Sequence, residues 1–137
     1  MIPFDTGDLS YSGQQQTQQD VVAYQTRGTL HSVRHAARNF VTGSFSFMVA
    51  DFSDATDQTA IDFLLKLGSY NGNTSTLSNS PEVYALDLLW TVEGSDHGDA
   101  ADHTCTMTDI VCTLDMAEGE PDTVTVSFTC YGSITYA

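Results

Sequence analysis

Positive charge is almost missing from this sequence. The 137 residues include 4 Lys+Arg against 18 Asp+Glu, which gives a formal net charge of −14. Nucleic-acid-binding proteins gain affinity by neutralising phosphates with basic side chains. Anionic lipid headgroups attract proteins through the same cations. The composition therefore argues against sequence-specific nucleic-acid binding and excludes docking on an anionic membrane surface.

Cysteines and long apolar runs are also scarce. The three cysteines, Cys105, Cys112 and Cys130, lie within alternating apolar and polar residues. Their odd number argues against a disulfide framework, and this setting is typical of thiols that act as small core residues. No apolar run approaches the ~20 residues that cross a bilayer, and no basic and apolar leader precedes Arg27. We expect a soluble protein made in a reducing cytoplasm.

The common catalytic motifs are absent as well. The sequence contains no G-x-x-x-x-G-K, G-x-G-x-x-G, G-x-S-x-G, H-E-x-x-H or C-x-x-C pattern, which are the signatures of phosphate, nucleophile and metal sites. Glu118 and Glu120 could be taken for an acid/base pair, but their Gly-Pro setting indicates an exposed hairpin tip. We therefore expect no enzymatic activity and no cofactor.

One segment, residues 96–105, keeps a metal-binding alternative open. Imidazole, carboxylate and thiol groups gather there, and these are the ligand types of transition metals. Their spacing matches no familiar metal motif, so a solvated acidic loop is the preferred interpretation. A metal- or ligand-binding β-barrel is the remote alternative that this segment would serve, through Asp96, His97, Asp99, Asp102, His103 and Cys105.

Alternation of apolar and polar residues is the main pattern in the sequence. Hydrophobic residues make up 41% of the chain, enough for one domain over residues 1–137. Residues 20–38 predict one or two strands, and clear alternation follows over 45–49, 83–92, 104–116 and 123–136. Its phase reverses near Asp109, which indicates a β-bulge or corner. The last segment has one apolar face and one Thr/Ser face.

The remaining segments are expected to be less regular. Helical spacing predicts one helix over residues 54–67, with Gly68 as its stop signal. Residues 1–20 read as a polar arm and residues 69–81 as a loop. The predicted fold is mainly β, a β-sandwich or a partly closed antiparallel barrel, with one flanking α-helix.

Charge is distributed unevenly along the chain. Residues 1–50 contain three acids and three bases, whereas residues 51–137 contain 15 acids and one base, Lys66. Such asymmetry can create complementary patches between copies of one chain. Arg27, Arg34 and Arg38 are therefore candidate inter-subunit contacts with acidic patches of a neighbouring copy.

The C-terminal part carries a recognisable pattern. A turn at Ala117, Glu118, Gly119, Glu120 and Pro121 is followed by an alternating strand with Val124, Val126, Phe128, Gly132 and Ile134. This pattern resembles the closing hairpin of the tail tube (major tail) proteins of long-tailed bacteriophages. The similarity extends over about 26 residues.

The resemblance implies a structural protein of the virion tail, made in the host cytoplasm. Such subunits close into hexameric rings that stack into a tube, contact other tail proteins, and have no catalytic residues or cofactor. Genomic DNA would pass through the tube without specific binding, and acidic residues lining the passage would repel phosphate. A tail terminator or a capsid decoration protein is the alternative within the virion.

Overall fold

The computed structural model describes residues 8–49, 60–72, 76–77 and 80–137. Within them the chain is mainly β and contains one short α-helix, which confirms the predicted fold class. The elements in chain order are β1 (Ser10–Ser12), β2 (Gln19–Thr26), β3 (Thr29–Arg38), β4 (Val41–Met48), α1 (Ala60–Leu65), β5 (Thr76–Leu77), β6 (Ser80–Tyr84), β7 (Leu86–Val92), β8 (His103–Ala117), β9 (Thr123–Cys130) and β10 (Ile134–Tyr136). Two 3₁₀ helices, Gly68–Tyr70 and Gly94–His97, lie in connections.

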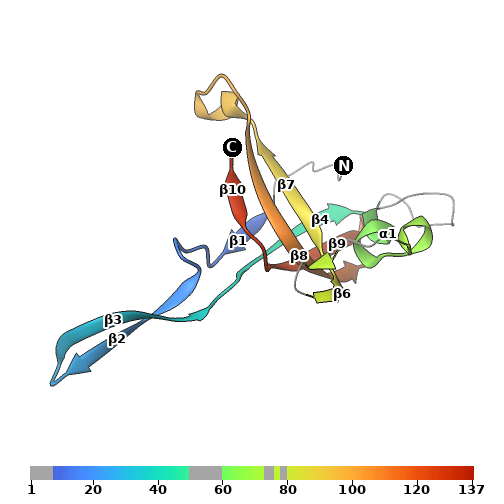
Figure 1. Cartoon of the computed structure of the whole chain (residues 1–137). Coiled ribbons are helices and arrows are strands. Elements are labelled where there is room, and N and C mark those ends of the chain that lie inside the picture. The colour runs from blue at the N-terminus through green and yellow to red at the C-terminus, as the bar shows by residue number, and fades with distance from the viewer. Residues whose placement is uncertain (1–7, 50–59, 73–75, 78–79) are drawn as a thin grey trace.

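An antiparallel sheet forms the body of the molecule. Its strand order is β1-β4-β9-β8-β10, and β7 pairs with β8. β4 runs along all of β9, from Val41 opposite Cys130 to Met48 opposite Thr123. The sheet curls into a half-barrel (Figure 1), so the partly closed barrel is the form that the fold takes.

A reversal at Asp109 lets the long strand β8 serve two sets of partners. Asp109 has a φ of 55°, and Met107 and Ile110 on either side of it are both buried. The first half of β8 pairs with β7 and β10, and the second half pairs with β9. The predicted change of phase is therefore confirmed as an irregularity at this residue.

The core lies on one face of the curled sheet. Alternate side chains of β9 are buried there against Val41 and Phe45 of β4, and α1 adds Ile61 and Leu64. All three cysteines are free thiols on this side, and burial raises the pKa of Cys112 to about 11. The opposite face of β9 carries hydroxyl side chains, as the alternation predicted: Thr123, Thr125, Ser127 and Thr129.

The helix ends earlier than the sequence predicted. Residues 54–59 lie outside the described residues, and α1 ends at Leu65 rather than at residue 67. Lys66 adopts a φ of 58°, and the amide of Leu67 donates to the carbonyl of Asp62 at 2.8 Å. This arrangement is a Schellman cap, so Lys66 and not Gly68 occupies the left-handed stop position.

Two segments expected to be irregular contain short strands. Ser10–Ser12, within the predicted polar arm, pairs with β4. Within the predicted loop over 69–81, Thr76 pairs with Tyr84 and Leu77 pairs with Ser80, at the two ends of β6. Residues 73–75 and 78–79 lie outside the described residues, as do 1–7. Strands of two or three residues are too short to show alternation, and pairing with a longer neighbour forms them. No helix in the described part of the chain is long and apolar enough to cross a membrane.

Candidate assembly surface

The hairpin of β2 and β3 projects away from the main sheet (Figure 1). In the described part of the chain these two strands pair only with each other. We call residues 19–38 the arm, which is a different segment from the polar arm predicted over residues 1–20. Both outer edges of this hairpin therefore present backbone groups that no other described strand pairs, and such edges are sites where another chain can add on.

Arg27 forms the tip of the arm in an unfavourable backbone conformation. Arg27 and Gly28 have φ values of 52° and 77° and connect the paired residues Thr26 and Thr29. Two-residue turns of this type favour Asn-Gly or Asp-Gly, because both positions are left-handed. An ordinary residue at the first position costs about 1–2 kcal/mol. The residue with this unfavourable conformation is therefore also the one that places a guanidinium at the end of the arm.

Large apolar side chains of the arm are exposed to solvent. Val21, Tyr24, Leu30 and Val33 are each more than half exposed. The register of the hairpin places Val21 and Val33 on one face and Tyr24 on the other, so both faces of the arm carry exposed apolar side chains. Exposed apolar side chains that gather on one projection favour an interaction site. The arm is therefore the candidate interaction surface of the described residues.

The three arginines predicted to make inter-subunit contacts all lie on the arm. Arg34 places its guanidinium 5.8 Å from the ring centre of Tyr24, on the projecting part. Arg38 at the base donates to the carbonyl oxygen of Tyr131 at 3.2 Å and lies over the ring of Phe40. Arg38 therefore attaches the arm to the body, while Arg27 and Arg34 are presented outward. Their contact with a neighbouring copy stays a prediction.

The arm differs in charge from the remainder of the chain. Three arginines and Asp20 give residues 19–38 a formal charge of +2, which leaves −16 on the rest. Most of the body's acids follow the arm in sequence, as the charge count predicted. A basic projection on an acidic body is complementary to a second copy of itself.

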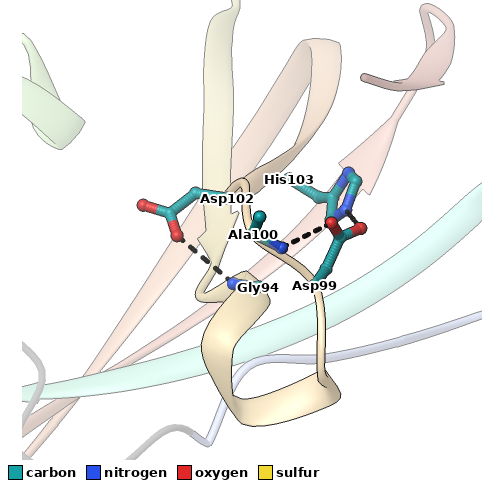
Figure 2. Close-up of polar contacts among 5 residues, drawn as sticks. All are labelled: Gly94, Asp99, Ala100, Asp102 and His103. Carbon is teal, nitrogen blue, oxygen red and sulfur yellow. Dashed lines mark hydrogen bonds and ion pairs between the residues drawn. The ribbon is translucent and has the colours of Figure 1, made fainter.

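An acidic loop over residues 93–102 joins β7 to β8. The Gly94 amide donates to Asp102 Oδ1 at 3.2 Å, the Ala100 amide donates to Asp99 Oδ1 at 2.7 Å, and His103 Nε2 lies 2.7 Å from Asp99 Oδ2 (Figure 2). The hydrogen bond to Asp99 raises the pKa of His103, and the same bond lowers the pKa of Asp99. These contacts give the exposed loop a defined shape.

Four of the six candidate metal ligands of residues 96–105 are used in other ways, and the other two, Asp96 and His97, are exposed. Asp99 and His103 pair with each other, Asp102 caps the amide of Gly94, and Cys105 is buried in the core. Among the described residues, no three His, Cys, Asp or Glu side chains form a group that could hold a metal ion. The geometry here favours the solvated acidic loop.

The residues of the family-like pattern lie in the closing hairpin and in β10. The single alternating strand predicted over residues 123–136 was wrong in its extent, because the chain leaves β9 after Cys130 and returns as β10 beside β8. Ala117 to Pro121 lead from β8 into the turn, where Glu118 and Glu120 are exposed. Val124, Val126 and Phe128 are buried in β9, and Ile134 begins β10. A Cβ at Gly132 would lie 2.5 Å from the carbonyl oxygen of Thr108, so glycine is needed where the chain crosses β8 closely.

An apolar groove beside the acidic loop was missed by the sequence reasoning. It has a volume of about 370 Å³ and lies across β7, β8 and β10. The shared face of Trp90 and Val92 was visible in the alternation, but nothing in the sequence indicated that β10 would lie two strands from β7. We call this site the end groove. Its lining residues are Trp90, Val92, His103, Thr104, Cys105, Tyr136 and Ala137.

Comparison with known proteins gives a likeness in fold. No family model and no curated protein matches the sequence. A solved structure described as the sheath/tube terminator of an extracellular contractile injection system, PVC, in its extended state, superposes with a TM-score of 0.57 at 13% sequence identity. The match covers 99% of this chain and 86% of that one. The chain therefore shares its fold with this sheath/tube terminator.

Proposed function

We propose that this protein is a structural subunit of a phage-tail-like particle, in which identical copies form a ring that terminates the tail tube. The fold likeness to a sheath/tube terminator extends over nearly the whole chain. A ring of identical copies needs two different surfaces that fit each other on every subunit. The arm and the acidic body supply surfaces of that kind.

The projecting arm is the observation that carries the proposal. Its exposed apolar side chains and unpaired edges are costly for an isolated molecule and useful for an assembled one. Binding to nucleic acid or to an anionic membrane would need a basic surface larger than three arginines on a chain of charge −14. Contact between copies would use the exposed apolar side chains, the unpaired strand edges and the arginines of the arm together.

A tail tube subunit is the second candidate. The closing hairpin around Ala117–Pro121 and β9 resembles tail tube proteins, and the same fold would serve in rings that stack repeatedly. The two candidates differ in the number of rings per tail, since a terminator forms one ring and a tube protein forms many. Other tail proteins are expected partners in both cases, and the particle's tail is the expected location.

The hydroxyl face of the sheet is the surface that we expect to line the passage. Side chains of Ser44, Thr113, Ser127 and Thr129 border an open groove of about 500 Å³ on this face. Uncharged hydroxyl groups offer phosphate no cation, and the surrounding negative charge repels it. DNA could move past such a wall without being retained.

Electron microscopy of the purified protein tests the proposal. Single rings of uniform diameter support the terminator, and long tubes of stacked rings support the tube subunit. Monomers at every salt concentration contradict both. A double variant, Leu30→Ser with Val33→Ser, should prevent rings while preserving the circular dichroism spectrum. Leu89→Ser is the matched control, because Leu89 is 67% exposed but lies outside the arm.

A further inference from the structure

We infer that the end groove of one copy receives the arm of a second copy, with Arg27 at the arm's tip lying against the acidic loop. The inference rests on the proposed function, because it concerns contact between identical subunits. It adds the receiving site, the direction of entry and the charges that hold the tip. Neither the sequence pattern nor the likeness in fold specifies these.

The end groove is apolar and open. Trp90, Cys105 and Tyr136 face one another across three strands, since Trp90 and Tyr136 are both register partners of Cys105. Trp90 is 38% exposed and Tyr136 is 59% exposed. Two partly exposed aromatic side chains flanking a groove are the usual anchors of a protein interface.

The arm of the same molecule does not lie at this groove. In Figure 1 the hairpin of β2 and β3 extends to one side, whereas the acidic loop caps the far end of β7 and β8. The arm's base is held in its direction by Arg38 and by the packing of Phe40 on Tyr131, with ring centres 4.8 Å apart. An arm that occupies the groove would therefore have to come from another molecule.

Charge complementarity identifies that molecule as a second copy. The groove ends at the acidic loop, where four carboxylates are exposed: Glu93, Asp96, Asp99 and Asp102. The arm holds three of the chain's four Lys and Arg residues. The strained turn places one of them, Arg27, at the tip, and conformations of this cost persist where they serve a function.

The dimensions of the two surfaces agree. Strands rise about 3.3 Å per residue, so Leu30, three residues after Arg27, lies roughly 10 Å or less from the tip. Val92 directly precedes the acidic loop, and Trp90 lies two residues further, about 7 Å along the strand. With Arg27 against the loop, Leu30 comes level with Val92 and Trp90. The apolar part of the arm then meets the apolar part of the groove.

Cysteine cross-linking between two single variants tests the contact. Copies with Leu30→Cys are mixed with copies with Val92→Cys under mild oxidation, and we expect covalent dimers on a denaturing gel. Mixing Leu30→Cys with Ser44→Cys, which lies on the hydroxyl face, is the matched control, and each variant alone measures any reaction of the native cysteines. Rings that form but cross-link only through Ser44→Cys, or not at all, overturn the inference and leave the proposed function standing.

Two substitutions at the tip test the charge contact. Arg27→Asn suits the turn better and removes the cation, so we expect a protein at least as stable as the natural one whose assembly is weakened about fivefold, the upper range for an exposed ion pair. Arg27→Lys keeps the charge and should assemble as the natural protein does. Asp96→Asn should weaken assembly in the same direction. Unchanged assembly of Arg27→Asn would overturn the role of the tip.

Discussion

The hydroxyl groups of Tyr11 and Tyr136 lie 2.8 Å apart and connect β1 to β10, from opposite ends of the described chain. Tyr136 also donates to Gln14 Oε1. Because a phenol has one proton, Tyr11 is the donor in the bond between the two tyrosines. This bond raises the pKa of Tyr11, because ionisation would remove its proton. The ring of Tyr11 also contacts Trp90 edge to face, so the first strand helps to hold the wall of the end groove.

This pair gives a stability prediction. Tyr136→Phe removes the acceptor of Tyr11 and the donor to Gln14, and we expect it to lower the free energy of unfolding by about 1–2 kcal/mol. Tyr11→Phe removes one bond and should cost about 1 kcal/mol. Urea denaturation measures both. Tyr24→Phe on the exposed arm is the control and should change stability by less than ~0.5 kcal/mol. Equal effects of all three variants would contradict the bonding scheme.

Close approach of two strands makes Gly132 sensitive to substitution. Its added Cβ would collide with Thr108, on the backbone as well as on the hydroxyl group. We expect Gly132→Ala to destabilise the protein by about 1–3 kcal/mol, the range for forced overpacking, measured by thermal or urea unfolding. Gly72→Ala is the control, because a Cβ there meets nothing within 4 Å. A Gly132→Ala protein as stable as the control would show that β10 can shift away from β8.

The contact between Asp99 and His103 predicts a pH window for the acidic loop. The raised pKa of His103 means that its stabilising contribution is complete below its ordinary value of 6.5 and is lost as pH rises through the raised value. The lowered pKa of Asp99 means that its contribution is present above 3.8 and is lost as pH falls through the lowered value. The loop is therefore held best between about pH 4 and 6.5.

NMR titration of the His103 imidazole checks this window. Asp99→Asn should move the pKa of His103 back toward its ordinary value, because the carboxylate that stabilises the imidazolium is gone. Asp96→Asn, on the same loop, is the comparison variant and should have a smaller effect. A His103 titration unaffected by Asp99→Asn would show that the two side chains do not pair in solution.

The charge distribution predicts that salt promotes assembly. Bodies with a formal charge of −16 outside the arm repel one another over distances that salt screens, with a Debye length of ≈ 30 Å at 0.01 M and about 8 Å at 0.15 M ionic strength. Contacts between the arm and the acidic loop act at shorter range and are screened less. We expect sedimentation velocity to show more assembly at 0.5 M than at 0.02 M sodium chloride. Assembly that falls as salt rises would show that attraction between unlike charges dominates.

Residue patterns in the sequence predicted much of the sheet. Alternation located β7, β8 and β9, the reversal at Asp109 and the two chemically different faces of β9, because burial on one side of a strand repeats every second residue. The helix was predicted in the right region but with the wrong end. Lys66 takes the left-handed position of a Schellman cap. This position usually holds Gly, so a lysine there gives no stop signal in the sequence.

The functional surfaces were only partly predictable. The count of charges singled out Arg27, Arg34 and Arg38 but could not show that Arg38 turns back to the carbonyl of Tyr131. The arm's independence from the sheet depends on which strands pair, and the end groove depends on β10 returning beside β8. Such long-range pairings leave no local trace in the residues that make them.

Among the described strands β2 and β3 pair only with each other, and this also bears on how the proposed ring would form. A hairpin closed by two residues forms within microseconds, before strands distant in sequence have found one another. Each newly synthesised chain would then expose the apolar side chains of the arm while the main sheet is still folding. Aggregation and ordered assembly would use the same exposed side chains. Under the proposed function, the yield of rings would therefore depend on how fast the main sheet folds relative to the rate of collisions between chains.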